Sequence, residues 1–488
     1  MNLKIKFDKY IIKITCKGLI IMAQLKYICI LFFIFIFSTL NVYSLNLKDT
    51  TAPKIDIVSP INAQQYIISK PTIRATFQDE NNIDLKSIKF FVNYKDVTKY
   101  CKIEDNSISY KPKNKFKRGT QIIEVHVSDI NKNKSKAEWY FNVGSPNYNH
   151  YYGLIHAHTS NSDGHGSFED AYYTSKFKAK LDFFAITDHS NMLDKDTEVT
   201  LDDGSLSSKW TSLINVSNNY TSNDKFLAVK GFEMTYPFKN NKDPIGHINV
   251  FNTNGFVSTN DSLYSNLENF YKEISKHDDL IAQFNHPCDT FGRFNNFKYN
   301  KDADSVISLI EVCNGYKSDI IKNRIAFEEY QKALDLGWHL APTSNQDNHR
   351  TDWGVANEFR TVVLCTGLNE NSFYDSLKNM RVYATQDKNI KIDYSINDQV
   401  MGSTIKNTSN LYFNISVIDN DLKDKIKRIE VISNDGKIVA YKNFSSNLAK
   451  LELKHSTLKD SYYYVKIYQN NDKISVTAPI WIEFKKEQ

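Results

Sequence analysis

The sequence predicts a multidomain protein in which a strand–helix region of barrel size lies between two β-rich regions. The chain has 488 residues, a length typical of about three domains. Its hydrophobic pattern alternates with period two in the first part, changes to apolar runs separated by amphipathic stretches, and then returns to period two. We therefore divide the chain into residues 1–44, 45–147, 148–386 and 387–488.

Composition and charge exclude several classes of protein. Hydrophobic residues make up 41% of the chain and aromatic residues 13%, which is enough for sizeable cores and excludes a disordered protein. The formal net charge is +5, but residues 1–44 contain six lysines and one aspartate, so the remainder is formally neutral. Because nucleic-acid binding needs clustered positive charge, we expect no nucleic-acid partner.

The first 44 residues read as a secretory signal peptide. The uncharged apolar run Tyr27–Phe37 follows Lys26 and precedes the small, polar stretch Ser38–Ser44. This order predicts cleavage after Ser44, with Met22 as an alternative true start. The alternative interpretation is an uncleaved membrane anchor. Both place the rest of the chain outside the cytoplasm, either secreted or at the cell surface.

The two flanking regions read as β-sandwiches. Residues 45–147 contain runs such as KIDIVSP, TIRATFQDE and QIIEVHVSDI, separated by turn residues, and resemble a bacterial immunoglobulin-like module. Residues 387–488 contain IKIDYSIN, LYFNISVID and IKRIEVISN and predict a second small sandwich. We expect these modules to contact the cell surface or carbohydrate, or to act as spacers. The cysteines after residue 44 have no paired spacing, so we expect buried thiols without disulfides.

The central region, residues 148–386, reads as an α/β fold. Strand-like runs include LIHAHT, DFFAITDH, FLAVKGFEM, LIAQFNHP and LIEVCN. Helical stretches between or after strands are predicted at Ser167–Lys180, Ser262–His277, Ile320–Leu336 and Asn371–Met380. Such alternation favours a parallel sheet covered by helices, and about 240 residues is the size of a barrel.

Histidines are concentrated in this central region. Ten of the chain's twelve histidines lie between His150 and His349, and most lie at an end of a predicted strand, where parallel α/β folds place their sites. His156 and His158 are two residues apart on one predicted strand, so their side chains share a face. Asp347 and His349 repeat this spacing.

Other strand ends carry further metal-binding side chains. His189, Glu233 and His286 end apolar runs, His247 opens HINVF, and Asp163 follows the first strand on a loop. Imidazole together with carboxylate is the ligand chemistry of Zn, Mn and Fe. Since one ion needs three or four protein ligands, nine candidates predict two or three divalent metal ions. The nine are His156, His158, Asp163, His189, Glu233, His247, His286, Asp347 and His349.

The motifs HAHT with SDG, AITDH, GFE, GHINVF, NHP and DNH, in this order over residues 148–386, resemble those of the polymerase and histidinol phosphatase (PHP) family. The resemblance implies a distorted seven-stranded (β/α) barrel, a trinuclear metal centre and phosphoester hydrolysis. It also implies that Glu233, Asp347 and His286 are catalytic as well as metal ligands. His165, in SDGHG, is an alternative to Asp163.

The resemblance further implies a distribution of the ligands over three ions. One ion would be held by His156, His158, Glu233 and Asp347. Glu233 would bridge to a second ion, which is also held by His247 and His286. The third ion would be held by Asp163, His189 and His349.

An export signal with flanking β modules resembles the carbaryl-hydrolase-like metallohydrolase branch of the family, as do GHINVF, RVYATQD and TAPIWIEF. The leading hypothesis is an exported phosphoesterase that uses metal-activated hydroxide on a small anionic substrate. Arg350 and Arg293, and also Arg381, are candidate contacts for the substrate anion. The alternatives are a carboxylic ester or carbamate hydrolase on the same metal centre, and a non-catalytic surface binding protein with a vestigial barrel. Nothing in the sequence predicts a particular oligomeric state.

Overall fold

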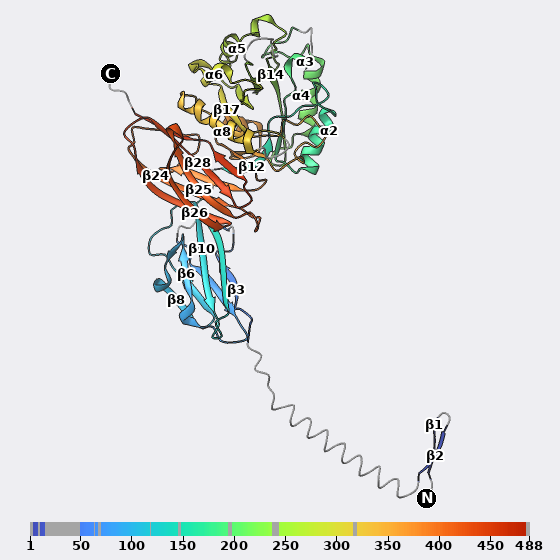
Figure 1. Cartoon of the computed structure of the whole chain (residues 1–488), viewed down its shortest axis with the longest axis vertical. Coiled ribbons are helices and arrows are strands. Elements are labelled where there is room, and N and C mark those ends of the chain that lie inside the picture. The colour runs from blue at the N-terminus through green and yellow to red at the C-terminus, as the bar shows by residue number, and fades with distance from the viewer. Residues whose placement is uncertain are drawn as a thin grey trace.

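The computed structural model describes residues 3–7, 10–14, 49–62, 64–66, 70–117, 119–144, 148–193, 198–236, 244–315 and 320–484 (Figure 1). They form a multidomain, mostly-β protein with several small sheets and one large mixed sheet. Strands β1 (Leu3–Phe7) and β2 (Tyr10–Ile14) pair antiparallel. The predicted apolar run Tyr27–Phe37 and the cleavage point after Ser44 lie outside the described residues. None of the described helices has both the length and the apolar character that crossing a membrane requires.

The first body of the structure is a sandwich of two small sheets. One has the order β3-β5-β9-β8 and the other β4-β11-β10-β6-β7. Trp139, Phe90 and Phe141 are fully or almost fully buried between them. Their bounds are β3 Lys54–Ser59, β4 Gln64–Tyr66, β5 Ile73–Gln78, β6 Lys89–Val92, β7 Lys95–Asp96, β8 Cys101–Glu104, β9 Ser107–Tyr110, β10 Gly119–Ser128 and β11 Lys134–Val143. The strands predicted in this region are confirmed, and β4 and β8 are additional.

The large sheet begins with the strands of the central region. In spatial order these are β18-β17-β16-β15-β14-β13-β12-β19-β20. Their bounds are β12 Asn149–Leu154, β13 Phe183–Ile186, β14 Leu227–Thr235, β15 His247–Phe251, β16 Ile281–Asn285, β17 Ile307–Cys313, β18 Ala341–Ser344, β19 Arg360–Cys365 and β20 Val382–Thr385.

The prediction of a parallel sheet was wrong at β15, and also at β19, which runs antiparallel to β12 and to β20. Strands β12 to β14 run parallel, as do β16 to β18, but β15 is antiparallel to both of its neighbours. The segment between Thr235 and His247 is too short for the helical crossover that a parallel connection needs. The reversal places the first residue of β15 beside the last residues of β14 and β16, since His247 pairs with Thr235 and with Asn285.

Helices cover the central strands. The four predicted helical stretches are confirmed, and α3, α4, α6 and α7 are additional. Helix α5 shows why: Leu267, Phe270, Tyr271 and Ile274 form a buried stripe at helical spacing, and Asn266 caps the first turn. The bounds are α2 Phe168–Tyr173, continued by a π turn to Lys178, α3 Ser190–Leu193, α4 Ser208–Tyr220, α5 Leu267–Ile274, α6 Phe294–Phe297, α7 Lys301–Asp304, α8 Ile320–Asp335 and α9 Glu370–Lys378.

The segments that follow β12 and β18 lie side by side, although these strands are far apart in the order of the sheet. The Ile155 backbone N–H donates to Asn345 Oδ1 at 2.7 Å, and the His158 backbone N–H donates to the Asn348 carbonyl at 3.0 Å. On the other side, the Thr187 N–H donates to the Ala157 carbonyl at 2.9 Å. These bonds gather the residues after β12, β13 and β18 at one edge of the central strands.

The last part of the chain forms a two-layered β structure, but one layer continues the large sheet. Strand β20 pairs with β29, with Tyr383 opposite Thr477, so strands on both sides of the predicted 386/387 boundary share one sheet. The separate layer contains β21 Lys391–Ile396, β22 Gln399–Val400, β24 Asn410–Ile418 and β27 Leu448–Ser456. The continuing layer contains β23 Thr404–Lys406, β25 Ile426–Ser433, β26 Lys437–Ser446, β28 Ser461–Gln469, β29 Ile474–Thr477 and β30 Ile480–Glu483. In Figure 1 these strands lie between the first sandwich and the central region.

The four cysteines of the described residues are free thiols, as predicted. Cys313 and Cys365 are buried, whereas Cys101 and Cys288 are only partly buried.

Candidate metal centre

All nine predicted ligands come together at one edge of the central strands. Strand β12 ends at Leu154, so the HAH motif lies just past it rather than on it, and Glu233 lies inside β14 rather than at its end. The reversed strand β15 still brings His247 to the same edge. We call the nine side chains the histidine cluster: His156, His158, Asp163, His189, Glu233, His247, His286, Asp347 and His349.

Glu233 lies at the centre of the histidine cluster. Its carboxylate is fully buried and is surrounded by five imidazoles. Oε2 lies 2.6 Å from His189 Nδ1 and 3.6 Å from His158 Nε2. Oε1 lies 3.3 Å from His156 Nε2, 3.3 Å from His247 Nδ1 and 3.6 Å from His286 Nε2. One carboxylate therefore has nitrogen neighbours on four different strands or strand ends.

Asp347 forms a second centre beside Glu233. Its Oδ1 lies 3.0 Å from His158 Nε2 and 3.2 Å from His156 Nε2. The same oxygen is 3.7 Å from His349 Nδ1. The backbone of Asp347 has a φ of +48°, in the left-handed region that costs energy for a non-glycine residue.

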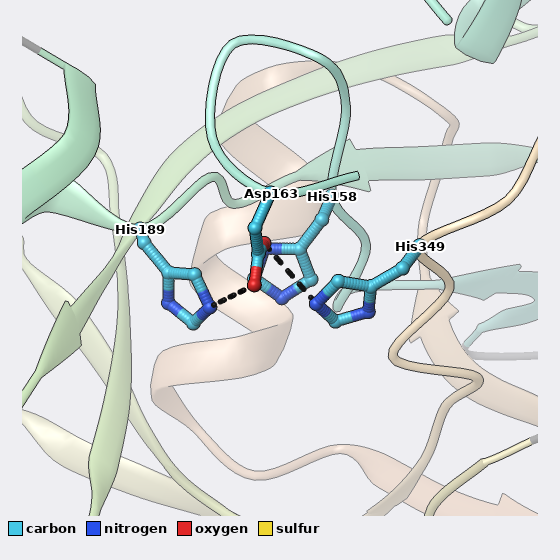
Figure 2. Close-up of side chains that lie close together, drawn as sticks. All are labelled: His158, Asp163, His189 and His349. Carbon is cyan, nitrogen blue, oxygen red and sulfur yellow. Dashed lines mark ion pairs between the residues drawn. The ribbon is translucent and has the colours of Figure 1, made fainter. Parts of the chain in front are cut away.

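Asp163 and His349 form the exposed side of the cluster. Figure 2 shows the Asp163 carboxylate between the rings of His189 and His349, at 3.5 Å and 3.2 Å from their Nε2 atoms. Side-chain exposure is 41% for Asp163 and 34% for His349, but zero for His156 and His158. Solvent and small molecules therefore reach the cluster from the Asp163 side.

The donor atoms fit divalent cations. Four groups have ligand atoms within 4.8 Å of one another: His158–Asp163–His189–His349, His156–His158–Asp347, His156–Glu233–His286 and His189–Glu233–His247. Glu233 Oε2 and His286 Nδ1 are buried and make no hydrogen bond. A buried oxygen that faces nitrogens without a hydrogen bond is costly unless a cation completes the site.

Electrostatics in the cluster also favour positive charge. Burial by itself lowers the pKa of His156, but Glu311, Asp347 and Glu233 outweigh it and hold that pKa well above its ordinary value. Burial opposes the same effect at His189, where Glu233 and Asp163 raise the pKa to about 10. Burial raises the pKa of Glu233, yet the surrounding imidazoles hold it well below its ordinary value. The carboxylates therefore need either imidazolium protons or bound cations.

Several buried polar residues that support the cluster were missed by sequence reasoning. Glu311, inside β17, accepts from His156 Nδ1 at 2.9 Å, and Asn285 Nδ2 donates to Glu233 Oε1 at 2.7 Å. A carboxylate inside the otherwise apolar run LIEVC was the available signal. Asp188 accepts from the Thr159 N–H and hydroxyl, both at 2.7 Å, and thus holds the start of the loop that carries Asp163.

The other residues that the sequence suggested for the site, His165, Arg293 and Arg381, each have a different set of neighbours. His165 Nδ1 lies 3.0 Å from the carbonyl of His349, and no group of potential ligands given above includes it. Arg293 pairs with Asp289 and with Glu329, whose Oε1 is 2.5 Å from its Nε. Arg381 precedes β20 at the opposite edge of the strands and pairs with Asp375.

Arg350 is exposed and follows His349 directly, and its backbone N–H donates to Asn348 Oδ1 at 2.7 Å. Of the three arginines predicted to contact the anion, Arg350 is the one that is adjacent in sequence to a member of the histidine cluster.

Comparison with known proteins finds no matching family model and no matching curated protein. Among solved structures, CopC from Methylosinus trichosporium OB3b is 12% identical, covering 20% of this chain and 98% of that chain, with a TM-score of 0.16. The fibronectin(III)-like modules of Clostridium thermocellum CbhA are 16% identical, covering 20% and 100%, with a TM-score of 0.15. A family 39 glycoside hydrolase from Bacteroides cellulosilyticus WH2 is 8% identical, covering 87% and 100%, with a TM-score of 0.19. At these TM-scores the likenesses carry no argument about this chain.

Proposed function

We propose that this chain is an exported, metal-dependent hydrolase of the PHP family that cleaves phosphoesters at the histidine cluster. The observation that carries the proposal is Glu233, a fully buried carboxylate among five imidazoles, with one oxygen that accepts no hydrogen bond. No lysine or arginine of the described residues forms an ion pair with Glu233, Asp163 or Asp347, so this described part of the chain supplies no fixed cation there.

The topology supports the barrel that this family implies. The seven strands β12 to β18 follow one another in chain order and in spatial order. The hydrogen bonds of Ile155 and His158 to the segment after β18 are those expected where such a row of strands closes on itself. We propose a distorted (β/α)7 barrel in which β15 is the reversed strand.

Two or three divalent ions, Zn, Mn or Fe, would be held by the four groups of ligands, with Glu233 shared between neighbouring groups. Such ions supply Lewis acidity and lower the pKa of bound water. The buried imidazoles of His156 and His158 would fix the positions of the inner ions, and Asp163 and His349 border the opening. Arg350, exposed beside His349, would bind the anionic group of the substrate.

A second candidate is hydrolysis of a carboxylic ester or carbamate at the same centre. Phe291 favours it, because its ring centroid lies 4.5 Å from that of His286 and 5.7 Å from that of His247, and its side chain is 37% exposed. An apolar surface beside the ligands suits a substrate with an uncharged aromatic group. The vestigial-barrel alternative would keep the fold without this activity.

The experiment is elemental analysis of the purified protein, followed by parallel assays. We expect two or three equivalents of Zn, Mn or Fe per chain. We then expect faster hydrolysis of p-nitrophenyl phosphate or its diester than of p-nitrophenyl acetate. Faster cleavage of the acetate would favour the second candidate. A folded chain that binds no metal under any loading condition would overturn the proposal, and full metal occupancy with no hydrolysis would favour a binding protein.

A further inference from the structure

We infer that Glu311 is a positioning residue that holds two ligand-bearing segments of the histidine cluster, His156 and His286, in the geometry needed to bind metal. This inference rests on the proposed function. Glu311 lies on β17, which contributes none of the nine predicted ligands, and its side chain is fully buried. A buried carboxylate in the middle of an apolar strand is costly unless its hydrogen bonds repay desolvation.

Each oxygen of Glu311 accepts two hydrogen bonds. Oε1 accepts from His156 Nδ1 and Asn345 Nδ2, both at 2.9 Å. Oε2 accepts from the His286 backbone N–H at 2.9 Å and from Asn314 Nδ2 at 2.8 Å. With four donors the carboxylate has no lone pair directed elsewhere, so Glu311 supports ligands and is not itself a tenth ligand.

The bond to His156 fixes the orientation of its ring. Because Nδ1 donates its proton to Glu311, Nε2 is the nitrogen that the neutral ring would offer to a metal, and Nε2 faces Glu233 at 3.3 Å and Asp347 at 3.2 Å. A carboxylate behind a histidine also increases the basicity of the ring nitrogen that binds the metal.

The bond to His286 holds a strained backbone. His286 has a φ of +29°, outside the regions that non-glycine residues ordinarily occupy. Its backbone N–H is held by Glu311 Oε2, while its Nε2 faces Glu233 and Asp347 at 3.6 Å and 3.9 Å. Glu311 therefore ties the segment after β16 to the segment after β12, and each supplies a ligand to one shared group, His156–Glu233–His286.

The test is Glu311→Gln in the full chain, measured with Zn²⁺ alone in competition with a chromogenic chelator. An amide presents one acceptor oxygen and one NH₂ group to four donors, so either His156 or His286 loses its partner. We expect Zn²⁺ affinity to fall by about 10- to 100-fold, the range for the loss of a carboxylate behind a metal-binding histidine. We also expect a changed visible absorption spectrum after Co²⁺ loading, because ligand orientation determines that spectrum.

Two further variants make the result decisive. Glu430→Gln removes a buried carboxylate of the C-terminal strand β25, bonded to Arg428 and Tyr468, and should leave Zn²⁺ affinity unchanged. Glu311→Asp keeps the charge but is too short to reach both partners, so we expect an intermediate loss of affinity; this variant decides the matter if Glu311→Gln does not fold. Wild-type affinity and Co²⁺ spectrum in a folded Glu311 variant would overturn the positioning role while leaving the proposed function intact. Failure of the wild-type protein to bind Zn²⁺ or Co²⁺ would instead overturn both.

Discussion

Two groups of carboxylates in this protein, each built around a fully buried member, balance their charge in opposite ways. In the histidine cluster, Glu233 and Asp347 are surrounded by imidazoles. In a second group, which we call the lysine cluster, Lys473 Nζ lies 2.6 Å from Glu358, 2.8 Å from Asp387 and 3.0 Å from Asp424. The lysine cluster carries its own permanent cation, whereas the histidine cluster becomes cationic only by binding protons or metal ions.

The contrast separates structural from functional carboxylates. Asp387 is fully buried, and burial raises its pKa, but Lys473 and backbone N–H donors more than offset this and lower it. Its charge is thus satisfied within the fold. One oxygen of Glu233 accepts no hydrogen bond. Its neighbours are imidazoles, which can balance its charge in place of a metal ion only when they are protonated. We expect metal-dependent behaviour from the histidine cluster alone.

The largest effect should come from Glu233→Gln. Replacing the shared carboxylate by an amide removes the charge that would bridge neighbouring ions, so metal affinity should fall by more than about 100-fold, beyond the loss for a residue behind a ligand. Elemental analysis after dialysis measures it. Asp387→Asn is the matched control in the lysine cluster and should keep the wild-type metal content. Equal metal content in the Glu233 and wild-type proteins would contradict the bridging role.

His349→Ala should have the next largest effect. His349 contacts Asp163 at 3.2 Å on the exposed side, so its loss should remove one equivalent of metal and lower hydrolysis by about tenfold or more, while the buried ligands keep the rest. Metal counting on His165→Ala provides the control, because this neighbouring histidine lies outside the four groups named above. If His165→Ala lost metal and His349→Ala did not, His165 would be the ligand and His349 would not.

Lys473→Met tests the lysine cluster. It leaves Asp387 buried without its cation, and removal of one partner of a fully buried pair costs about 3–5 kcal/mol. Because the Lys473 side chain is 21% exposed, we expect the free energy of unfolding to fall by only about 2 kcal/mol. Urea denaturation measures this. Metal content should not change; a loss of metal would indicate that the two clusters are coupled.

Asp419→Asn should give the smallest effect, and one that depends on pH. Burial and the nearby Asp387 raise the pKa of Asp419 to about 7, above its ordinary value near 4. The folded chain therefore binds this proton more tightly than the unfolded chain, and stability falls as pH rises from about 4 to about 7. Asparagine cannot ionise, so the variant should gain on the order of 1 kcal/mol over wild type at pH 8 relative to pH 5. Urea denaturation curves of both proteins at the two pH values measure this difference. An equal stability difference at both pH values would contradict the raised pKa.

Sequence reasoning identified the nine side chains because most of them lie at or near the end of an apolar run, a pattern that is visible in the sequence alone. It could not identify Glu311 as a supporting residue, because its four hydrogen bonds come from residues 156, 286, 314 and 345. It also could not show that Arg293 is already paired with carboxylates, since its partners, Asp289 and Glu329, lie four and thirty-six positions away.

The amino-acid sequence by itself determined the strand–helix alternation, the β-rich flanks and the chemical identity of the cluster, because local hydrophobic periodicity and residue type are properties of short segments. Only the tertiary structure decided that β15 runs backwards, that β20 joins the C-terminal strands through β29, and that Glu233 rather than any histidine lies at the centre. Those features depend on which distant strands pair and on which buried charges must find partners, and both are fixed only when the whole chain has packed.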